Sequence, residues 1–528
     1  MATANPAAAA SAFAPPLTPD GEALKPGTIP HHALTFALML ATIVQVLDTT
    51  IANVALPHMQ TSLGATYDTV TWVLTSYIVA AAVAIPITGW LADRVGRRRL
   101  FLFAITGFVA SSMLCGIATS LEEMVMFRIF QGITGAFISP LGQAVMLDIN
   151  PQERHGKAMA VWGMGVMVAP IVGPVLGGVL TEQFDWRWVF FVNVPIGALC
   201  LLLLFMYLPD QKKPKRGFDL FGFALLALGL ASLQLMLDRG QGEDWLQSTE
   251  VMIELGLAVA GLWMFGVHMA TGRRTLFPRT LLMNRNLMAG VLLMAIAGVA
   301  IFANMAILPP MLQNLYGYSV IQTGLLLAPR GVGILFTMWV AGQLLGRIDP
   351  RILIVSGLLI TSFSLWLMTG WSLDQDFHPI IWSGVIQGLG MGLIFVPVNA
   401  TAFATLDPSQ RTDGSSLLNL SRSLGGSIGI SLVVTMLARG SQRAHEIIGS
   451  HVTQAALGPL GSGEIARLGS IADSAAMMVN AEVTRQAMMI GYLDDFHLMM
   501  LSTLAAIPFA LVMKPAKPGA PPPPPMGE

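Results

Sequence analysis

Charged residues are scarce in this sequence. They make up 11% of its 528 residues, whereas 54% belong to the hydrophobic set AVILMFWYC and the mean hydropathy is +0.66. Soluble domains usually carry about 25% charged residues, so this chain has less than half of the usual solvating surface. That shortage argues against a water-soluble multidomain enzyme and places most of the chain in lipid. The net charge of −1 offers no basis for nucleic-acid binding.

Signatures of disulfides, nucleotide hydrolysis and metal catalysis are missing as well. The two cysteines, Cys115 and Cys200, lie in apolar runs, which predicts buried thiols rather than a disulfide framework. There is no Gly-x-x-x-x-Gly-Lys-Ser/Thr phosphate loop. His445 and His451 are six residues apart, so they do not share the helix face that a zinc-protease pair needs. We therefore expect no enzyme activity, no metal and no cofactor.

Long apolar runs dominate what is present. A membrane-spanning helix needs about 20 mostly apolar residues, and the chain contains fourteen such segments. They are roughly 34–56, 70–91, 100–118, 123–146, 157–180, 188–208, 218–237, 250–270, 287–312, 321–345, 352–371, 379–403, 413–437 and 493–513. Because fourteen is even, both ends of the chain lie on one side of the membrane. Residues 1–32 are rich in Ala and Pro and lack the basic start of a signal peptide. We expect them to form a disordered tail, as we do the proline-rich residues 514–528.

Positive charge is shared unevenly between the two sides. Twenty Lys and Arg residues lie in the tails and the loops on the tail side, but the short loops on the other side hold only Arg187 and Arg239. Cytoplasmic loops of membrane proteins carry an excess of Lys and Arg. The sequence therefore predicts a multi-pass protein of the bacterial inner membrane with both tails in the cytoplasm.

Two parts of the chain repeat each other weakly. The string GWLADRVGRRRL at 89–100, after the second span, matches GQLLGRIDPRIL at 342–353, after the tenth, at five positions with an offset of 253. Gln131 in span four recurs as Gln387 in span twelve, with an offset of 256. The matched spans are eight apart, so the repeats point the same way. The predicted fold is all-α, with six-helix bundles at 33–208 and 271–513, a basic loop at 209–217 and two inserted helices at 218–270.

Five segments together resemble a known family. They are LDTTIANVALP at 47–57, GWLADRVGRRRL at 89–100, RIFQG at 128–132, GVMVAPIVGPVLGG at 165–178 and WRWVFFVNVPIG at 186–197. Over about residues 33–513 the chain resembles the major facilitator superfamily, and in particular its fourteen-helix drug–proton antiporters of the EmrB/QacA type. The string LDRG at 237–240, followed by Asp244 and Trp245, looks especially like the EmrB-type members. The resemblance implies the major facilitator fold and export of small lipophilic compounds, driven by the proton gradient without a cofactor.

Asp48 is an acidic residue inside the first span. It lies eight residues before the predicted outer end, or about 12 Å deep at ~1.5 Å per residue. An ionised and unpaired carboxylate at that depth is costly, so the group takes up a proton readily. These properties suit a proton carrier that is neutral when facing one side and ionised when facing the other. The alternative is a structural aspartate that is hydrogen-bonded to Thr49 or to a neighbouring helix.

Arg128 enters span four from the outer side and lies about 8 Å deep by the same rise. Its depth is close to that of Asp48, so the two side chains are candidates for a pair. Because a guanidinium stays charged, it would favour the ionised form of Asp48 and assist proton release. The alternative is a packing arginine whose N–H groups are satisfied by backbone carbonyls.

The loop after the second span is rich in arginine and is predicted to turn tightly through Gly96. In the resembled family this loop holds the two halves together when the transporter is open to the outside. The resemblance implies that Asp93 pairs with a local arginine and faces a helix N-terminus of the other half, such as that of span thirteen. Alternatively, the arginines only hold the span in place. The residues of this motif are Gly89, Asp93, Arg94, Gly96, Arg97 and Arg98.

Span five carries a small residue at every fourth position and two prolines. Small residues let helix backbones approach closely, and prolines bend the helix. A close-packed, bent span at the interface between the halves suits a hinge or a seal against leakage, with ordinary membrane packing as the alternative. The residues are Gly165, Pro170, Gly173, Pro174, Gly177 and Gly178.

Several polar or aromatic side chains within the spans are candidates for lining a substrate cavity. Each of them alone is more often a helix–helix hydrogen bond, whereas together with 32 methionines they suit a pliant lipophilic pocket. Arg330 and Arg422 lie deep in their spans and would either anchor an anionic substrate or tie helices together. The candidates are Gln45, Asn53, Trp72, Gln131, Asn304, Arg330, Gln387, Asn399 and Arg422.

The outer loop at 438–492 is much longer than the other loops. Its second half, from about Glu464 to Gln486, reads as a polar helix with apolar interruptions. The resemblance to EmrB-type members implies contact with a periplasmic membrane-fusion adaptor. A solvated spacer, or an outward extension of spans thirteen and fourteen, explains the pattern equally well.

Three functions are compatible with the sequence. They are a proton-coupled multidrug exporter, a dedicated carrier of one metabolite such as a vitamin, siderophore or amino-acid derivative, and a transporter-like sensor that binds its ligand without moving it. The presence of Asp48 argues against the sensor. The family resemblance implies a monomeric transport unit, and the substrate and the proton stoichiometry stay open.

Overall fold

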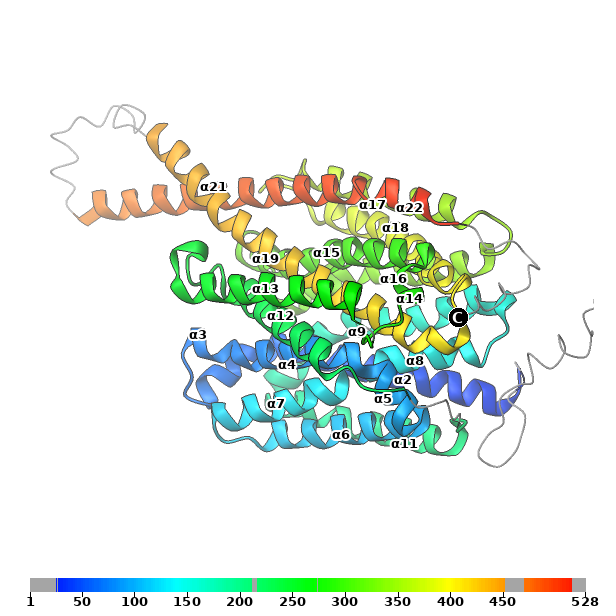
Figure 1. Ribbon diagram of the computed structural model, residues 1–528. Coiled ribbons are helices and arrows are strands. Elements are labelled where there is room, and N and C mark those ends of the chain that lie inside the picture. The colour runs from blue at the N-terminus through cyan, green and yellow to red at the C-terminus, as the bar shows by residue number, and fades with distance from the viewer. Residues whose placement is uncertain (1–24, 26, 211–215, 273, 452–469, 515–528) are drawn as a thin grey trace, which may run out of the picture.

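Fourteen long apolar helices run side by side in the protein (Figure 1). A computed structural model describes residues 25, 27–210, 216–272, 274–451 and 470–514, and the helix count refers to these residues. Most of the two predicted tails and part of the basic loop 209–217 lie outside the described residues. The fourteen predicted spans are confirmed in number and order, and their ends shift by a few residues except in spans one, thirteen and fourteen.

The helices alternate in direction across the bundle. We call the face where the first helix begins and the last one ends the terminal face; it lies on the right in Figure 1. In chain order the spans are α2 (Ile29–Ser62), α4 with α5 (Trp72–Ala84, Thr88–Val95), α6 (Arg97–Ile117), α7 with α8 (Leu121–Gly135, Ile138–Asp148), α9 (His155–Gln183), α11 (Asn193–Tyr207), α12 (Leu220–Arg239), α13 (Thr249–Thr271), α15 (Arg285–Asn314), α16 (Val320–Leu344), α17 (Pro350–Met368), α18 (Phe377–Ala404), α19 (Arg411–His451) and α21 with α22 (Ser470–Leu504, Ile507–Val512). Three single-turn helices, α3 (Tyr67–Val70), α10 (Trp188–Phe191) and α14 (Arg279–Leu282), lie in the connections.

Local sequence signals mark several helix ends. The Ser120 hydroxyl accepts a hydrogen bond from the backbone N–H of Glu123 (3.2 Å) at the start of α7. Ser319 and Gln322 form a capping box at the start of α16. Gly96 separates α5 from α6 with a φ of 98°, a conformation that favours glycine. The tight turn between these two helices therefore depends on a residue without a Cβ.

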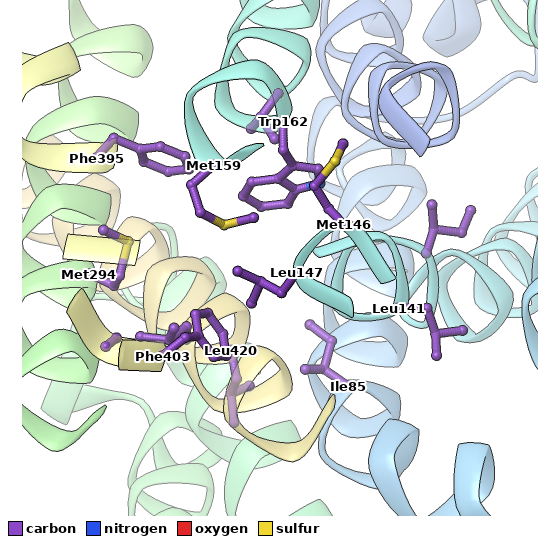
Figure 2. Packing of buried hydrophobic residues seen from close by; sticks show 14 of the residues in the cluster. Ile85, Leu141, Met146, Leu147, Met159, Trp162, Met294, Phe395, Phe403 and Leu420 are labelled. Atoms are coloured by element: carbon purple, nitrogen blue, oxygen red, sulfur yellow. The ribbon is translucent and has the colours of Figure 1, made fainter. Parts of the chain in front are cut away.

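The long helices pack in two sets with a continuous apolar core between them. Helices α2 to α11 contact one another, and so do α15 to α22, while α8 contacts α19 and α9 contacts both α16 and α18 across the junction. In Figure 2, Met159 and Trp162 of the first set lie opposite Met294 and Phe395 of the second. The rings of Trp162 and Phe395 are stacked, with centroids 6.0 Å apart. Close apolar packing therefore joins the two sets at this level.

The inserted helices α12 and α13 form a hairpin that touches both sets. Helix α12 contacts α4 of the first set and α19 of the second. Gln234 Nε2 donates to Ser427 Oγ (2.8 Å), and the carboxylate of Asp238 accepts a hydrogen bond from Thr75. Most of α13 is exposed and apolar, so it faces lipid. The hairpin covers one side of the junction between the sets.

A loop over all of 438–492 is wrong, whereas the alternative of an outward extension of spans thirteen and fourteen is confirmed for the described residues. Helix α19 continues to His451 and α21 begins at Ser470, so only residues 452–469, outside the described residues, separate them. The two extensions pack against each other and project beyond the other helices (Figure 1). The predicted polar helix at Glu464–Gln486 is therefore the start of α21 from Ser470 onward. Hydropathy measures only the apolar length, whereas a helix continues wherever polar residues with adequate helix propensity follow.

Candidate functional site

Asp48 lies at the centre of a buried polar cluster in the first set of helices. Its Oδ2 accepts a hydrogen bond from Arg128 Nη1 (2.5 Å), and its Oδ1 accepts from Gln131 Nε2 and Asn193 Nδ2 (both 2.8 Å). The side chains of Asp48 and Arg128 are fully buried. A buried charge is tolerated when it is paired and hydrogen-bonded. This geometry therefore fits an ionised Asp48 that is bound by one cation and two amides.

Four helices position this cluster. Asp48 comes from α2, Arg128 and Gln131 from one face of α7, and Asn193 from the first turn of α11. Arg128 Nε also donates to the Val73 carbonyl of α4 (3.0 Å), and its Nη1 donates to Gln131 Oε1 (2.7 Å). A change in the charge of Asp48 therefore acts on the contacts among four helices.

Aromatic rings enclose the cationic side of the cluster. The Arg128 Cζ atom lies 4.4 Å from the centroid of the Tyr77 ring and 5.7 Å from that of Phe190, which adds cation–π attraction. The structure thus places the two residues singled out for proton coupling in direct contact. Helix α2 runs on to Ser62, so Asp48 lies 14 residues from its end instead of the predicted eight.

The cluster combines one carboxyl group with a guanidinium and two amides. Asp48 is surrounded by nitrogen donors, which attract an anion and would repel a metal cation. Within the described ranges, no three His, Cys, Asp or Glu side chains are grouped as metal ligands.

Asp148 joins the two sets of helices near the terminal face. Its carboxylate, at the end of α8, forms an ion pair with Arg97 at the start of α6. It also accepts a hydrogen bond from Arg411 Nη1 (2.7 Å) at the start of α19, in the second set. The sequence analysis missed Asp148, because an acid at the end of a span carries no signal of its partners.

Asp93 lies beside a second ion pair between the sets. Arg216 Nη2 donates to Asp413 Oδ1 (2.7 Å) in the first turn of α19, and Arg216 Nε lies 3.5 Å from Asp93 Oδ2. Gly89 packs so closely on Asp413 that a Cβ there would overlap its carboxylate. The arginine that the structure places beside Asp93 thus comes from the basic loop 209–217, whereas the prediction took it from the motif.

The other motif arginines contact their own set. Arg98 Nη2 donates to the carbonyl of Phe205 (2.7 Å) and its guanidinium lies 5.4 Å from that ring. The guanidinium of Arg94 lies 5.7 Å from the centroid of the Trp90 ring. These two arginines therefore stabilise the ends of α5 and α6 locally, and the links to the second set come from Asp148 and Arg216.

The small residues of α9 face α2, within the first set. A Cβ added at Gly173 would overlap a side chain of α2, and Gly165 and Gly177 also lie against that helix. For these residues the predicted place at the interface between the halves is wrong. That interface is instead formed by residues such as Ile171, which fills the space beside Gly331 of α16.

The remaining residues of the α9 motif have two different settings. Gly178 lies beside Val320 at the start of α16, so it does face the second set. Pro170 and Pro174 lie inside α9, which continues through both of them. A spacing of four residues identifies one side of a helix, but it does not identify the neighbour on that side.

The cavity candidates of the first set do not lie together. Gln45 is hydrogen-bonded to α8 (2.7 Å), and Gln131 belongs to the Asp48 cluster. Asn53 is exposed. The centroid of the Trp72 ring lies 5.8 Å from the guanidinium of Arg239 in the inserted hairpin. These four side chains therefore do not line a common cavity in the structure.

Gln143, which the sequence analysis missed, is the polar centre of the junction. Its Nε2 donates to Asn399 Oδ1 (2.6 Å), and its Oε1 accepts from Ser415 Oγ (2.6 Å) and Asn419 Nδ2 (3.0 Å). The side chain is fully buried. Asn399 therefore lies at the junction, as a hydrogen-bonding link between α8 and α18.

The two deep arginines of the second set lack acidic partners. Arg330 Nη1 donates to Asn304 Oδ1 (3.4 Å), and Arg422 Nη2 donates to Asn419 Oδ1 (3.0 Å). Neither arginine makes an ion pair with any residue that the structure describes. Arg422 lies in a close-packed part of the junction without room for a water molecule, beside Trp162, Met294, Phe395, Asn399, Leu418 and Asn419.

Replacing Asp148 is expected to loosen the junction at the terminal face. Asp148→Asn removes the anion between Arg97 and Arg411, and hydrogen bonds to charged groups contribute about 1.5–3 kcal/mol. We expect Ser415→Cys, at a buried junction position, to react with a maleimide about tenfold faster in the Asp148→Asn background, with Cys115 and Cys200 replaced. Asp210→Asn, an exposed acid on the same face, is the control. Equal labelling rates of Ser415→Cys in the Asp148→Asn and Asp210→Asn backgrounds would contradict a linking role for Asp148.

Comparison with known proteins agrees with this architecture. Residues 38–430 match the family model described as Major Facilitator Superfamily. The chain is 37% identical over 415 residues to the multidrug export protein EmrB of Escherichia coli (strain K12), covering 78% of this chain and 81% of that protein. It is 33% identical over 486 residues to the fatty acid resistance protein FarB of Neisseria gonorrhoeae, covering 91% of this chain and 96% of FarB.

Solved structures show the same fold at lower sequence similarity. The proton:xylose symporter XylE superposes with a TM-score of 0.60 and 14% identity, over 91% of this chain and 95% of XylE. At that identity the likeness concerns the fold alone. The family model and the curated relatives cover most of the chain. The chain therefore belongs to the Major Facilitator Superfamily, as a membrane transporter of the EmrB type.

Proposed function

We propose that this chain exports small lipophilic compounds in exchange for protons, with Asp48 as the proton carrier. The observation that carries the proposal is the fully buried Asp48–Arg128 pair, with Gln131 and Asn193 as further donors. Ionisable residues inside membrane spans are rare and mark ion or proton pathways by default. The names of the relatives, multidrug export for EmrB and fatty acid resistance for FarB, support export as the direction of transport.

Protonation of Asp48 would act on the helices through Arg128. In the ionised state the carboxylate ties α2 to α7 and α11. Neutral Asp48 no longer attracts the guanidinium, and a buried cation without an anion is unfavourable. The helices then favour an arrangement in which Arg128 regains solvent or another acceptor. This difference between the two protonation states is what proton coupling requires.

The orientation proposed from the arginine and lysine bias places the terminal face in the cytoplasm. The ion pairs of Asp148 and Asp413 and the hydrogen bonds of Gln143 then close the cytoplasmic side. Alternating access predicts that these links break when the transporter opens to the cytoplasm. The transport unit is proposed to be a monomer, since both sets of helices belong to one chain.

A transport assay with an imposed proton gradient tests the proposal. The full chain is produced in an efflux-deficient bacterial host, and resistance to a panel of lipophilic compounds is recorded. Everted membrane vesicles with an acidic interior should then accumulate a lipophilic dye, and collapse of the proton gradient should release it. Resistance to a single metabolite analogue would favour a dedicated carrier, and accumulation that ignores the gradient would contradict proton exchange.

The outward extensions of α19 and α21 are proposed to contact a periplasmic membrane-fusion adaptor. They project beyond the other helices and carry exposed apolar side chains such as Ile447 and Met477. Cysteines at these two positions should form crosslinks to a periplasmic membrane-fusion protein that is produced in the same cells. Cysteines at the exposed Trp263 and Trp339, which lie on lipid-facing spans, are the control. Equal crosslinking at all four sites would contradict this contact.

A further inference from the structure

The second set of helices contains a buried cluster of hydrogen-bond donors that has a cation but no anion. Arg330 is 8% exposed, and Asn304 and Gln387 are fully buried. Arg330 Nη1 donates weakly to Asn304 Oδ1 (3.4 Å), and its Nη2 lies 3.5 Å from the sulfur of Met391. Among the residues that the structure describes, Asn304 Nδ2 and both polar atoms of Gln387 have no hydrogen-bond partner.

Gln387 lies on the side of α18 that faces Arg330. Gly384 and Met391, one turn before and one turn after Gln387, are both next to Arg330: a Cβ added at Gly384 would lie 3.6 Å from the Arg330 Cβ. Positions three and four apart share one face of a helix. The guanidinium and the unpartnered amide groups therefore border one small region between α15, α16 and α18.

This region occupies the place in the second set that the Asp48 cluster occupies in the first. Asp48 and Asn304 are 256 positions apart, as are Gln131 and Gln387. The second set thus keeps the glutamine but has an amide where the first set has its carboxylate. The repeat therefore lacks an anion at this position.

The guanidinium is also present in the second set, supplied from a different helix. The position 256 residues after Arg128 is Gly384, which has no side chain. Arg330 lies 253 positions after Tyr77, the residue whose ring encloses Arg128 in the first set. Arg330 therefore brings from α16 the positive charge that Arg128 brings from α7, and no acid accompanies it.

A buried cation without an anion is unfavourable unless a partner arrives during the working cycle. Resting on the proposed export function, we propose that Arg330, Asn304 and Gln387 form an anion site that binds the carboxylate of a lipophilic transported acid. The guanidinium of Arg422 lies 5.8 Å from the centroid of the Phe395 ring, one turn after Met391 on α18, and adds a second positive charge. The apolar part of the same molecule would contact Trp162 and Phe395, whose rings are stacked in this structure and would separate to admit it.

Binding of matched probes to the purified full chain in nanodiscs tests this site. We expect radiolabelled dodecanoate to bind at least about tenfold more tightly than 1-dodecanol or dodecyltrimethylammonium at neutral pH, as a charge-assisted hydrogen bond allows. Arg330→Gln should remove that preference, whereas Arg330→Lys should keep part of it. Arg439→Gln, at an exposed position of the same set, should leave it unchanged.

A second variant keeps the test decisive if Arg330→Gln folds poorly. Asn304→Asp puts a carboxylate beside Arg330, as in the first set, so it should raise the melting temperature and abolish the preference for dodecanoate. Equal binding of dodecanoate and dodecanol by the wild type, or an unchanged preference in both Arg330→Gln and Asn304→Asp, would overturn the proposal. Proton-driven export of a neutral dye would survive that result, so the proposed function is tested separately.

Discussion

Asp48→Asn is expected to reduce proton-driven transport to the background of vesicles without the protein. Asparagine has nearly the same shape as aspartate, but its Nδ2 donates where the carboxylate accepts, so part of the contacts with Arg128, Gln131 and Asn193 is lost. An amide cannot take up and release a proton as a carboxylate does, so the step that couples the gradient to the helices is lost. The measurement is dye accumulation in everted vesicles with an acidic interior, with substrate binding to the purified protein recorded in parallel.

Binding should persist in Asp48→Asn, because the substitution removes coupling rather than the cavity. Substrate affinity should also lose the pH dependence that proton exchange imposes on the wild type. Asp238→Asn is a matched control, since Asp238 is a carboxyl on the inserted hairpin whose partner is the hydroxyl of Thr75. Gradient-driven accumulation by Asp48→Asn at the wild-type rate would exclude Asp48 as the carrier.

Arg128→Leu is expected to be the most destabilising single substitution in the first set. It leaves Asp48 fully buried with only two amide donors, and breaking a buried ion pair by removing one partner costs about 3–5 kcal/mol. The melting temperature of the purified protein should fall accordingly, and transport should be lost. Arg239→Leu, in a partly exposed network with Glu243 and Glu250, should cost at most about 1 kcal/mol.

The double variant Asp48→Asn/Arg128→Leu separates the pair from general packing. In the double variant both charged partners are absent, so no buried charge is left without a partner. Much of the stability that Arg128→Leu alone loses should therefore return. Transport should stay absent, because no proton carrier remains. A double variant as unstable as Arg128→Leu alone would show that packing against Tyr77 and Phe190, and not the ion pair, explains the loss.

The number and order of the spans followed from the sequence because they depend on composition along one dimension. Apolar runs long enough to cross a bilayer identify spans, and the described part of the chain contains all fourteen. The ends of spans thirteen and fourteen could not be placed in this way, because α19 and α21 continue as helices beyond the apolar runs. Polar helical turns outside lipid have no hydropathy signal, so the sequence left a loop and an extension of the two spans equally open.

The residues of the site were only partly accessible to sequence reasoning. Asp48 and Arg128 were singled out because charges inside apolar spans are conspicuous and their depths were similar. Asn193 and Gln143 are neutral amides, which occur in many spans as ordinary helix contacts, so nothing in the pattern separated them from their neighbours. Their roles depend on which side chains of neighbouring helices lie within hydrogen-bond distance of them.

By itself the sequence determined that the chain is a fourteen-helix membrane protein with a buried acid and a buried arginine, because burial in lipid constrains composition. Only the tertiary structure decided that Asp148 and Asp413 hold the two sets of helices together, that the glycines of α9 pack on α2, and that Arg330 has no acidic partner. These contacts join residues far apart in the chain. Helical periodicity specifies the face on which a side chain lies, but the neighbour on that face is set by how the helices pack in three dimensions.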